Sequence, residues 1–141
     1  MKSKTSILNI YFDEELNLVI MEWKGYSTSI QFRQGIELML KFMVLNNCSN
    51  VLANIREMVL IGVDDQKWLY ENFFLKAIKF GFNKIAIITP ESYFNKIGLE
   101  NVSNKIDKKK LKINFFDDVE EAKEWLKTTN AVDLKISENE R

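Results

Sequence analysis

The feature that most constrains this sequence is the alternation of short β-branched runs with helical segments long enough to connect parallel strands. Residues 7–12 and 16–23 are rich in β-branched and aromatic residues, and only an acidic tripeptide, Asp13 to Glu15, separates them. Together they predict an antiparallel hairpin. Further strands are expected at 51–58, 84–89 and 112–116, with helices between and after them.

The element order β-β-α-β-α-β-α-β-α predicts a single α/β domain with a mixed, mainly parallel, five-stranded sheet. We expect this domain to cover residues 6–127 and residues 128–141 to form a polar, frayed C-terminal tail. The second strand of the hairpin is apolar at almost every position, so it should be covered on both faces of the sheet.

Helix boundaries are indicated by capping residues. Thr28 followed by Gln31 has the form of a capping box that opens a helix running to about Asn47. The other expected caps are Asp64 or Asp65 before a helix over 66–80 that ends at Gly81, Thr89 before Pro90 at the start of a helix interrupted near Gly98, and Asp118 before a last helix.

Charge and composition exclude several function classes. Twenty Lys and Arg balance twenty Asp and Glu, so there is no net field to attract nucleic acid or an anionic membrane. The sequence contains no histidine, which removes His-dependent nucleophile pairs and His zinc sites. The single cysteine, Cys48, indicates a reducing, cytoplasmic setting. We expect no signal peptide and no membrane span, because the apolar runs are short.

Two helices carry more apolar surface than one sheet face requires. In the first helix, Leu38, Phe42 and Leu45 form a stripe beside the core stripe, and in the second helix Trp68 and Leu75 are seven residues apart on the outward side. These five residues predict a surface for a protein partner or for a second copy of the chain. The alternative is an apolar pocket between the helices and the sheet that takes a small apolar or lipid-like ligand.

A polar cluster is expected where the hairpin meets the third strand. Asn54 and Arg56 share one face of that strand, and Glu22 and Arg33 should lie nearby, with Trp23 beside them. A buried arginine must be paired, so an ion pair is the simpler interpretation and an anion site for a carboxylate or phosphate is the alternative. No glycine-rich phosphate loop supports nucleotide binding.

Neither a metal site, a cofactor, a nucleic-acid site nor catalysis is predicted. The acidic residues near strand ends, Asp64, Asp65 and Asp118, are explained as helix caps. The lysines between 105 and 112 lack the interleaved aromatic residues that stack on bases, so they indicate a solvated turn. No pair of Asp, Glu, Lys, Tyr or Cys residues has a recognised catalytic spacing.

Several short motifs resemble one known family. They are Glu22-Trp23-Lys24-Gly25, Phe32-Arg33-Gln34-Gly35, Asn54-Ile55-Arg56, Asp65-Gln66-Lys67-Trp68 and the run from Phe116 to Leu126. With the element order, they resemble the bacterial STAS-like proteins related to the anti-sigma factor antagonist SpoIIAA, over residues 6–127. The resemblance implies a STAS-like fold and a non-catalytic role, either partner switching or, by analogy with CRAL-TRIO domains, lipid carriage.

The chain departs from the antagonists at their regulatory position. Those proteins carry a phosphorylatable Ser or Thr in the loop after the third strand. The corresponding stretch here, Glu57 to Asp64, contains no hydroxyl residue. Control by phosphorylation at that position is therefore not predicted.

Overall fold

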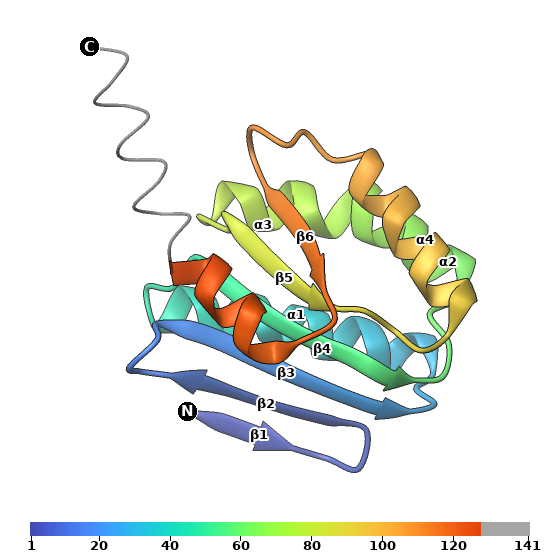
Figure 1. Ribbon diagram of the computed structural model, residues 1–141, viewed down its shortest axis with the longest axis horizontal. Helices are drawn as coiled ribbons and strands as arrows, with labels where there is room; N and C mark the ends of the chain where they lie inside the picture. The colour runs from blue at the N-terminus through green and yellow to red at the C-terminus, as the bar shows by residue number, and fades with distance from the viewer. Residues whose placement is uncertain (128–141) are drawn as a thin grey trace.

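One six-stranded sheet organises the computed structural model, which describes residues 1–127 (Figure 1). Its strands are β1 (Lys2–Lys4), β2 (Leu8–Asp13), β3 (Leu18–Gly25), β4 (Asn50–Met58), β5 (Lys84–Ile88) and β6 (Lys112–Phe116). The helical elements are α1 (Ser29–Leu45), α2 (Val63–Trp68), the π-helical turn η1 (Leu69–Phe73), α3 (Phe74–Lys79), α4 (Tyr93–Asn104) and a helix over 119–127. The tail expected at 128–141 lies outside the described residues.

The strands lie in the sheet in the same order as in the sequence. β1, β2 and β3 pair antiparallel, whereas β3 to β6 are parallel to one another. Successive right-handed crossovers in one direction place their connecting helices on the same face. Accordingly, α1, α2, α3 and α4 cover one face, and the helix over 119–127 crosses the other (Figure 1).

Each face of the sheet has its own apolar core because side chains alternate along a strand. In β3, Val19 and Met21 are buried under α1 and its neighbours, while Leu18 and Ile20 are buried under Ala122 and Leu126. This confirms the expectation that the second hairpin strand is covered on both faces. The α/β class is likewise confirmed, with a mixed sheet.

The sheet differs from the expectation by one strand. β1 was not predicted, because Lys2, Ser3 and Lys4 have no apolar alternation. They nevertheless pair with β2 at the edge of the sheet, where charged side chains are common because they discourage pairing with other chains. The sheet therefore begins at Lys2 and not at residue 7.

Three of the expected caps are present as predicted. Thr28 and Gln31 form the capping box at the start of α1. At the end of α3, Gly81 has φ +101° and the N–H of Phe82 donates to the carbonyl of Ala77, which is the Schellman arrangement. Asp118 also accepts from the Glu121 N–H at 3.3 Å, as a cap of the last helix should.

Other expected helix boundaries are wrong. The cap residue of α2 is Gly62 rather than Asp64 or Asp65, and that of α4 is Ser92 rather than Thr89. The α4 helix is not interrupted at Gly98. This glycine is buried because the side chain of Gln66 from α2 occupies the space where a Cβ would be.

The helix expected over 66–80 contains a π-helical turn in its middle. Such a turn adds about one residue and rotates the following turns by roughly 100° relative to a regular α-helix. Phe73 and Phe74, which flank the end of this turn, are both buried, whereas Phe80 is exposed. Because of this turn, Trp68 and Leu75 lie on different sides of the helix. In a regular α-helix, residues seven positions apart would lie on the same side.

Candidate functional site

Exposed apolar side chains gather where the parallel strands β3, β4 and β5 end. Tyr26 follows β3, Leu60 and Val63 follow β4, and α4 after β5 begins with an aromatic pair and Ile97. We call this set the carboxyl-edge surface; its residues are Tyr26, Leu60, Val63, Tyr93, Phe94 and Ile97. Tyr93 is 75%, Val63 64% and Tyr26 61% exposed, values far above those of ordinary apolar residues in a folded domain.

Two hollows make the carboxyl-edge surface continuous. One, of about 320 Å³, is lined by Tyr26, Leu60 and Val63 together with polar residues at the starts of α1 and α2, including Asp64 and Asp65. The other, of about 460 Å³, is lined by Val63, Tyr93, Phe94 and Ile97. Val63 lines both hollows, so its side chain lies between them.

Asn95 fixes the loop that carries much of this surface. It is completely buried, and its Oδ1 accepts from the Ile61 N–H at 2.8 Å. Its Nδ2 donates to the Met58 carbonyl at 3.1 Å. The amide of Gln66 donates in turn to the Ile61 carbonyl at 2.8 Å. Side chains of α2 and α4 therefore satisfy backbone groups of the loop after β4 and hold it in one conformation.

A polar contact joins the beginnings of α1 and α2 beneath the surface. Asp65 is buried, and its Oδ1 accepts from Ser29 Oγ at 2.6 Å and from Arg33 Nε at 2.9 Å. The Arg33 guanidinium lies 5.2 Å from the centre of the Trp68 ring. Asp65 thus links two helices instead of capping one, and Trp68 serves as a platform for Arg33.

The five residues expected to form an apolar interaction surface do not lie together. Phe42 is only 4% exposed and belongs to the core, so the expectation is wrong for this residue. Leu38 and Trp68 are half-buried and pack against the core, while Leu45 and Leu75 are exposed on different helices. The apolar arc of α1 is broad because both β2 and β3 lie beneath it.

The expected polar cluster is divided between the two faces of the sheet. Trp23 points into the helix-covered core, and Arg33 on α1 pairs with Asp65. Glu22 and Asn54 are register partners on the opposite face, because alternate residues of a strand point to opposite sides. Arg33 is therefore not part of the group that contains Arg56.

Short-range partners satisfy the residues of the opposite face. Glu22 Oε1 accepts from Asn9 Nδ2 at 2.7 Å, and Asn54 Oδ1 accepts from the Arg56 N–H at 3.2 Å. The Arg56 guanidinium donates to the carbonyl of Asp117 at the end of β6. Arg56 thus ties the end of β4 to the loop after β6, and its partner is a carbonyl rather than the expected carboxylate.

Tyr11 and Cys48 have clearly perturbed pKa values. Burial raises the pKa of Tyr11 on β2, and the nearby carboxylates of Glu22 and Asp13 raise it further. Burial also raises the pKa of the Cys48 thiol, although hydrogen bonds with backbone groups partly offset the effect. Both shifts favour the neutral form, which is the opposite of what an activated nucleophile requires.

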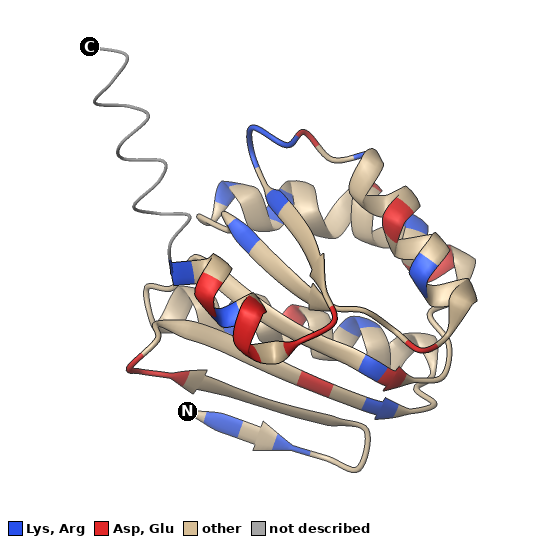
Figure 2. Ribbon diagram, viewed as in Figure 1, with Lys and Arg blue, Asp and Glu red and all other residues tan. Residues whose placement is uncertain are grey.

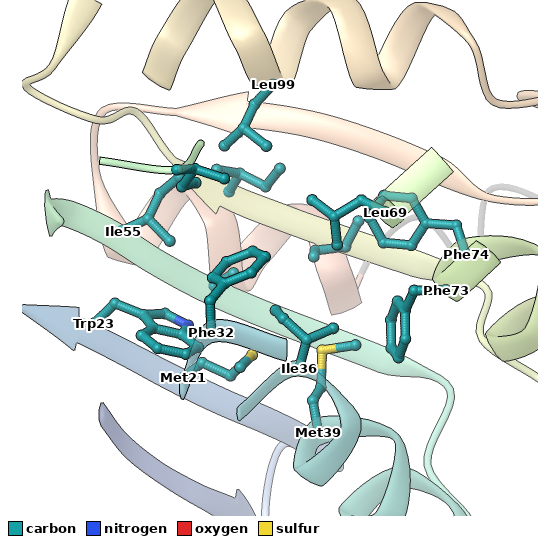
Figure 3. A pocket seen from close by; sticks show the side chains of 14 residues that line it. Met21, Trp23, Phe32, Ile36, Met39, Ile55, Leu69, Phe73, Phe74 and Leu99 are labelled. Atoms are coloured by element: carbon teal, nitrogen blue, oxygen red, sulfur yellow. The ribbon is translucent and has the colours of Figure 1, made fainter. Parts of the chain in front are cut away.

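An apolar cavity lies between the sheet and the helices (Figure 3). Trp23, Phe32, Ile36, Phe73 and Leu99 are among its lining side chains, and all of its lining residues are apolar. Its volume is about 50 Å³. A cavity that binds benzene has a volume of about 150 Å³, so this one accommodates a smaller group unless side chains move.

Among residues 1–127, no three acidic, Cys or His side chains are grouped in a way that could hold a metal ion. No helix in the same range combines the length and the apolar character needed to cross a bilayer.

Comparison with known proteins gives no relative. No family model, no curated protein sequence and no solved structure matches the chain significantly.

Sequence reasoning missed the carboxyl-edge surface, although a signal was present. It lies in short apolar runs at positions where polar residues are usual, Val59-Leu60-Ile61 in the loop after β4 and Tyr93-Phe94 at the start of α4. The apolar period of a single helix does not reveal this surface, because its residues come from the loops after β3 and β4 and from the starts of α2 and α4. Asn95 gives no signal of its own, because a buried asparagine cannot be distinguished from an exposed one in the sequence.

Proposed function

We propose that this chain is a non-catalytic protein-interaction module of the STAS-like type, and that its contact surface is the carboxyl-edge surface. The observation that supports this proposal is the exposure of Tyr93, Val63 and Tyr26 around two adjoining hollows at one edge of the sheet. Contiguous apolar patches of this kind mark interaction sites, and tyrosine is enriched in the contacts that carry binding energy.

The proposed module acts in the cytoplasm and is not controlled by phosphorylation after β4. The single buried cysteine is consistent with a reducing compartment. The loop after β4 presents Val59, Leu60 and Val63, with no hydroxyl group among residues 57–64. The partner therefore meets an apolar loop at this position and not a phosphate.

A comparative capture experiment tests the proposed function. The wild-type chain, Phe94→Glu and Leu75→Glu are immobilised and exposed to lysate of the native cells, and bound proteins are quantified by mass spectrometry. Phe94 lies on the carboxyl-edge surface, whereas Leu75 is equally exposed but lies on α3. We expect a partner, or the chain itself, to be retained by wild type and Leu75→Glu and lost by Phe94→Glu. Equal retention by all three would contradict the assigned surface.

A second candidate function is the carriage of a small apolar ligand. It is supported by the cavity of about 50 Å³, whose lining is entirely apolar. A ligand that binds only the folded state raises the melting temperature, because it adds stability that grows with the logarithm of 1 plus the ratio of its concentration to Kd. We expect xenon, which is smaller than benzene, to raise the melting temperature of wild type, and Ala53→Val, which narrows the cavity, to abolish the effect. No shift with xenon or with dodecanoic acid would exclude the carrier function.

A further inference from the structure

The carboxyl-edge surface carries protrusions and hollows side by side. Tyr93 and Val63 are its most exposed members, and the hollows of about 320 and 460 Å³ lie on either side of Val63. In a twofold interface one patch meets a second copy of itself, so the patch must contain both the knobs and the spaces that receive them. This surface meets that condition.

Side chains of both charge signs surround the carboxyl-edge surface, and they are free to form ion pairs with a partner. Asp64 and Lys67 are exposed on α2, and Lys96 and Glu100 are exposed on α4 (Figure 2). Within residues 1–127, none of these four side chains forms an ion pair. Two residues of each sign at the rim allow opposite charges to meet when the patch faces its own copy.

The same charges disfavour other large partners. An anionic bilayer or a nucleic acid would select an excess of Lys and Arg around the apolar residues, and that excess is absent here. The chain as a whole has a formal net charge of zero, so two copies do not repel one another at long range. A second copy of the chain is therefore the occupant that the charges favour.

The surface is also held in place before any partner binds. Asn95 fixes the backbone at Met58 and Ile61, and Gln66 packs on Gly98 between α2 and α4. A surface that is already ordered loses little conformational entropy on association. This lowers the cost of forming a contact from a modest number of apolar side chains.

From these observations we infer that the chain forms a twofold symmetric homodimer through the carboxyl-edge surface, with Val63 and Tyr93 of each copy entering the hollows of the other. This inference rests on the proposed function and names its partner. The dimer should be specific for this face: exposed apolar residues elsewhere, such as Leu75 and Phe80, take no part in it.

Native mass spectrometry and light scattering over a concentration series test the inference. The variants are Tyr93→Glu and Val63→Glu, made separately, with Leu75→Glu as the matched control. Tyr93 and Val63 are the first residues of α4 and α2, where a negative charge is favourable, so both variants should fold normally. Melting temperatures equal to that of wild type verify this.

We expect wild type and Leu75→Glu to be dimers, and each surface variant to have a dimer Kd raised by about tenfold or more. A wild-type chain that is monomeric at every concentration would overturn the homodimer. It would leave the interaction module to be decided by the capture experiment, in which a different protein would be retained. A dimer that survives both surface variants, or that Leu75→Glu disrupts equally, would overturn the assigned face.

Discussion

The buried side chain of Asn95 stabilises the loop after β4 by pairing with two of its backbone groups. A buried amide that pairs with both an N–H and a carbonyl of the same loop replaces two hydrogen bonds that water would otherwise provide. Replacement by alanine leaves the Ile61 N–H and the Met58 carbonyl without these partners. The loop after β4, and with it Leu60 and Val63, then loses its anchor.

We predict that Asn95→Ala lowers the free energy of unfolding by about 2–4 kcal/mol, since each unsatisfied buried group costs about 1–3 kcal/mol. Urea denaturation measures this, with Asn101→Ala, an exposed position of the same helix, as the control. The control should change stability by less than about 0.5 kcal/mol. A loss at Asn95 no larger than that of the control would show that water replaces the amide.

Gly35 of α1 allows the helix to lie directly on β2 and β3. A Cβ at this position would lie 2.8 Å from Leu8 Cδ2 and closer still to the indole of Trp23. Alanine is the better helix former by about 1 kcal/mol, but overpacking a tight core costs about 1–3 kcal/mol. Because the indole is buried and cannot move away freely, we expect Gly35→Ala to be destabilising overall.

Thermal and urea unfolding of Gly35→Ala test this prediction, with Gln34→Ala at the neighbouring exposed position as the control. The helix propensity of the control changes little, so its stability should match that of wild type. A Gly35→Ala protein more stable than wild type would mean that α1 shifts away from the sheet at little cost.

The Cys48 thiol links stability to alkaline pH. Burial raises its pKa above the ordinary value of about 8.5, so the folded state holds the proton more tightly than the unfolded chain does. Below about pH 8 both states are protonated and the stabilisation is fully present. As the pH rises, the unfolded chain ionises first, so this stabilisation is lost as the pH passes through the folded pKa.

We therefore predict that the free energy of unfolding falls more steeply with pH in wild type than in Cys48→Ala between about pH 8 and 10, by at most about 1.4 kcal/mol per pH unit. Urea denaturation at each pH measures both proteins. Cys48→Ala also controls for Tyr11. The raised pKa of Tyr11 makes stability fall with pH equally in wild type and in the variant. Identical slopes in the two proteins would contradict the assignment to Cys48.

At the scale of elements, the helix over 119–127 is the sole described cover of its sheet face. Ala122 and Leu126 are fully buried against Leu18, Ile20 and Leu52. Deleting buried methyl groups removes transfer free energy and leaves a cavity. We predict that Leu126→Ala lowers the free energy of unfolding by about 2–4 kcal/mol.

Chemical denaturation measures this loss, with Glu121→Ala on the exposed side of the same helix as the control. The control should change stability by less than about 0.5 kcal/mol. A small effect of Leu126→Ala, similar to that of the control, would contradict the assignment of Leu126 to the core of this face.

The elements that the sequence predicted well are those that its local pattern determines. Strand β6 coincides with the expected 112–116, and the capping box at Thr28 and Gln31 was visible because both partners are three residues apart. The π-helical turn η1 was not visible, because no local capping or breaking residue marks it between Trp68 and Phe74. A regular helical period therefore misplaced Trp68 and Leu75.

The candidate site was less predictable than the fold for a related reason. We expected Arg33 to lie near Glu22 and Arg56, on the basis of the strand pairing alone. In the structure Arg33 instead pairs with Asp65, which is 32 residues away in the sequence and lies on another helix. Which face a side chain occupies decides its partners, and that depends on the register of β3 against β4, including the irregularity between Glu22 and Lys24. The carboxyl-edge surface likewise exists only after the segments that follow β3, β4 and β5 have been brought together.

At the scale of the whole molecule, the absence of histidine removes the side chain that most often titrates near neutrality. Histidine is the side chain whose ordinary pKa lies between about 5 and 8, and the sequence contains none. The pKa of Tyr11 and that of Cys48 are raised, which moves both away from this interval. Protonation should therefore change little as the pH passes through it.

We predict that both the melting temperature and the mass of the assembly in solution stay constant between about pH 5.5 and 7.5. Stability depends on pH only where the folded and the unfolded chain bind different numbers of protons. Association depends on pH only where the monomer and the dimer bind different numbers of protons. Scanning calorimetry and light scattering at matched ionic strength measure the two quantities. A melting temperature that rises or falls by several degrees within this interval would reveal a carboxyl group with a strongly raised pKa. A change in mass alone would place that group at the interface between copies.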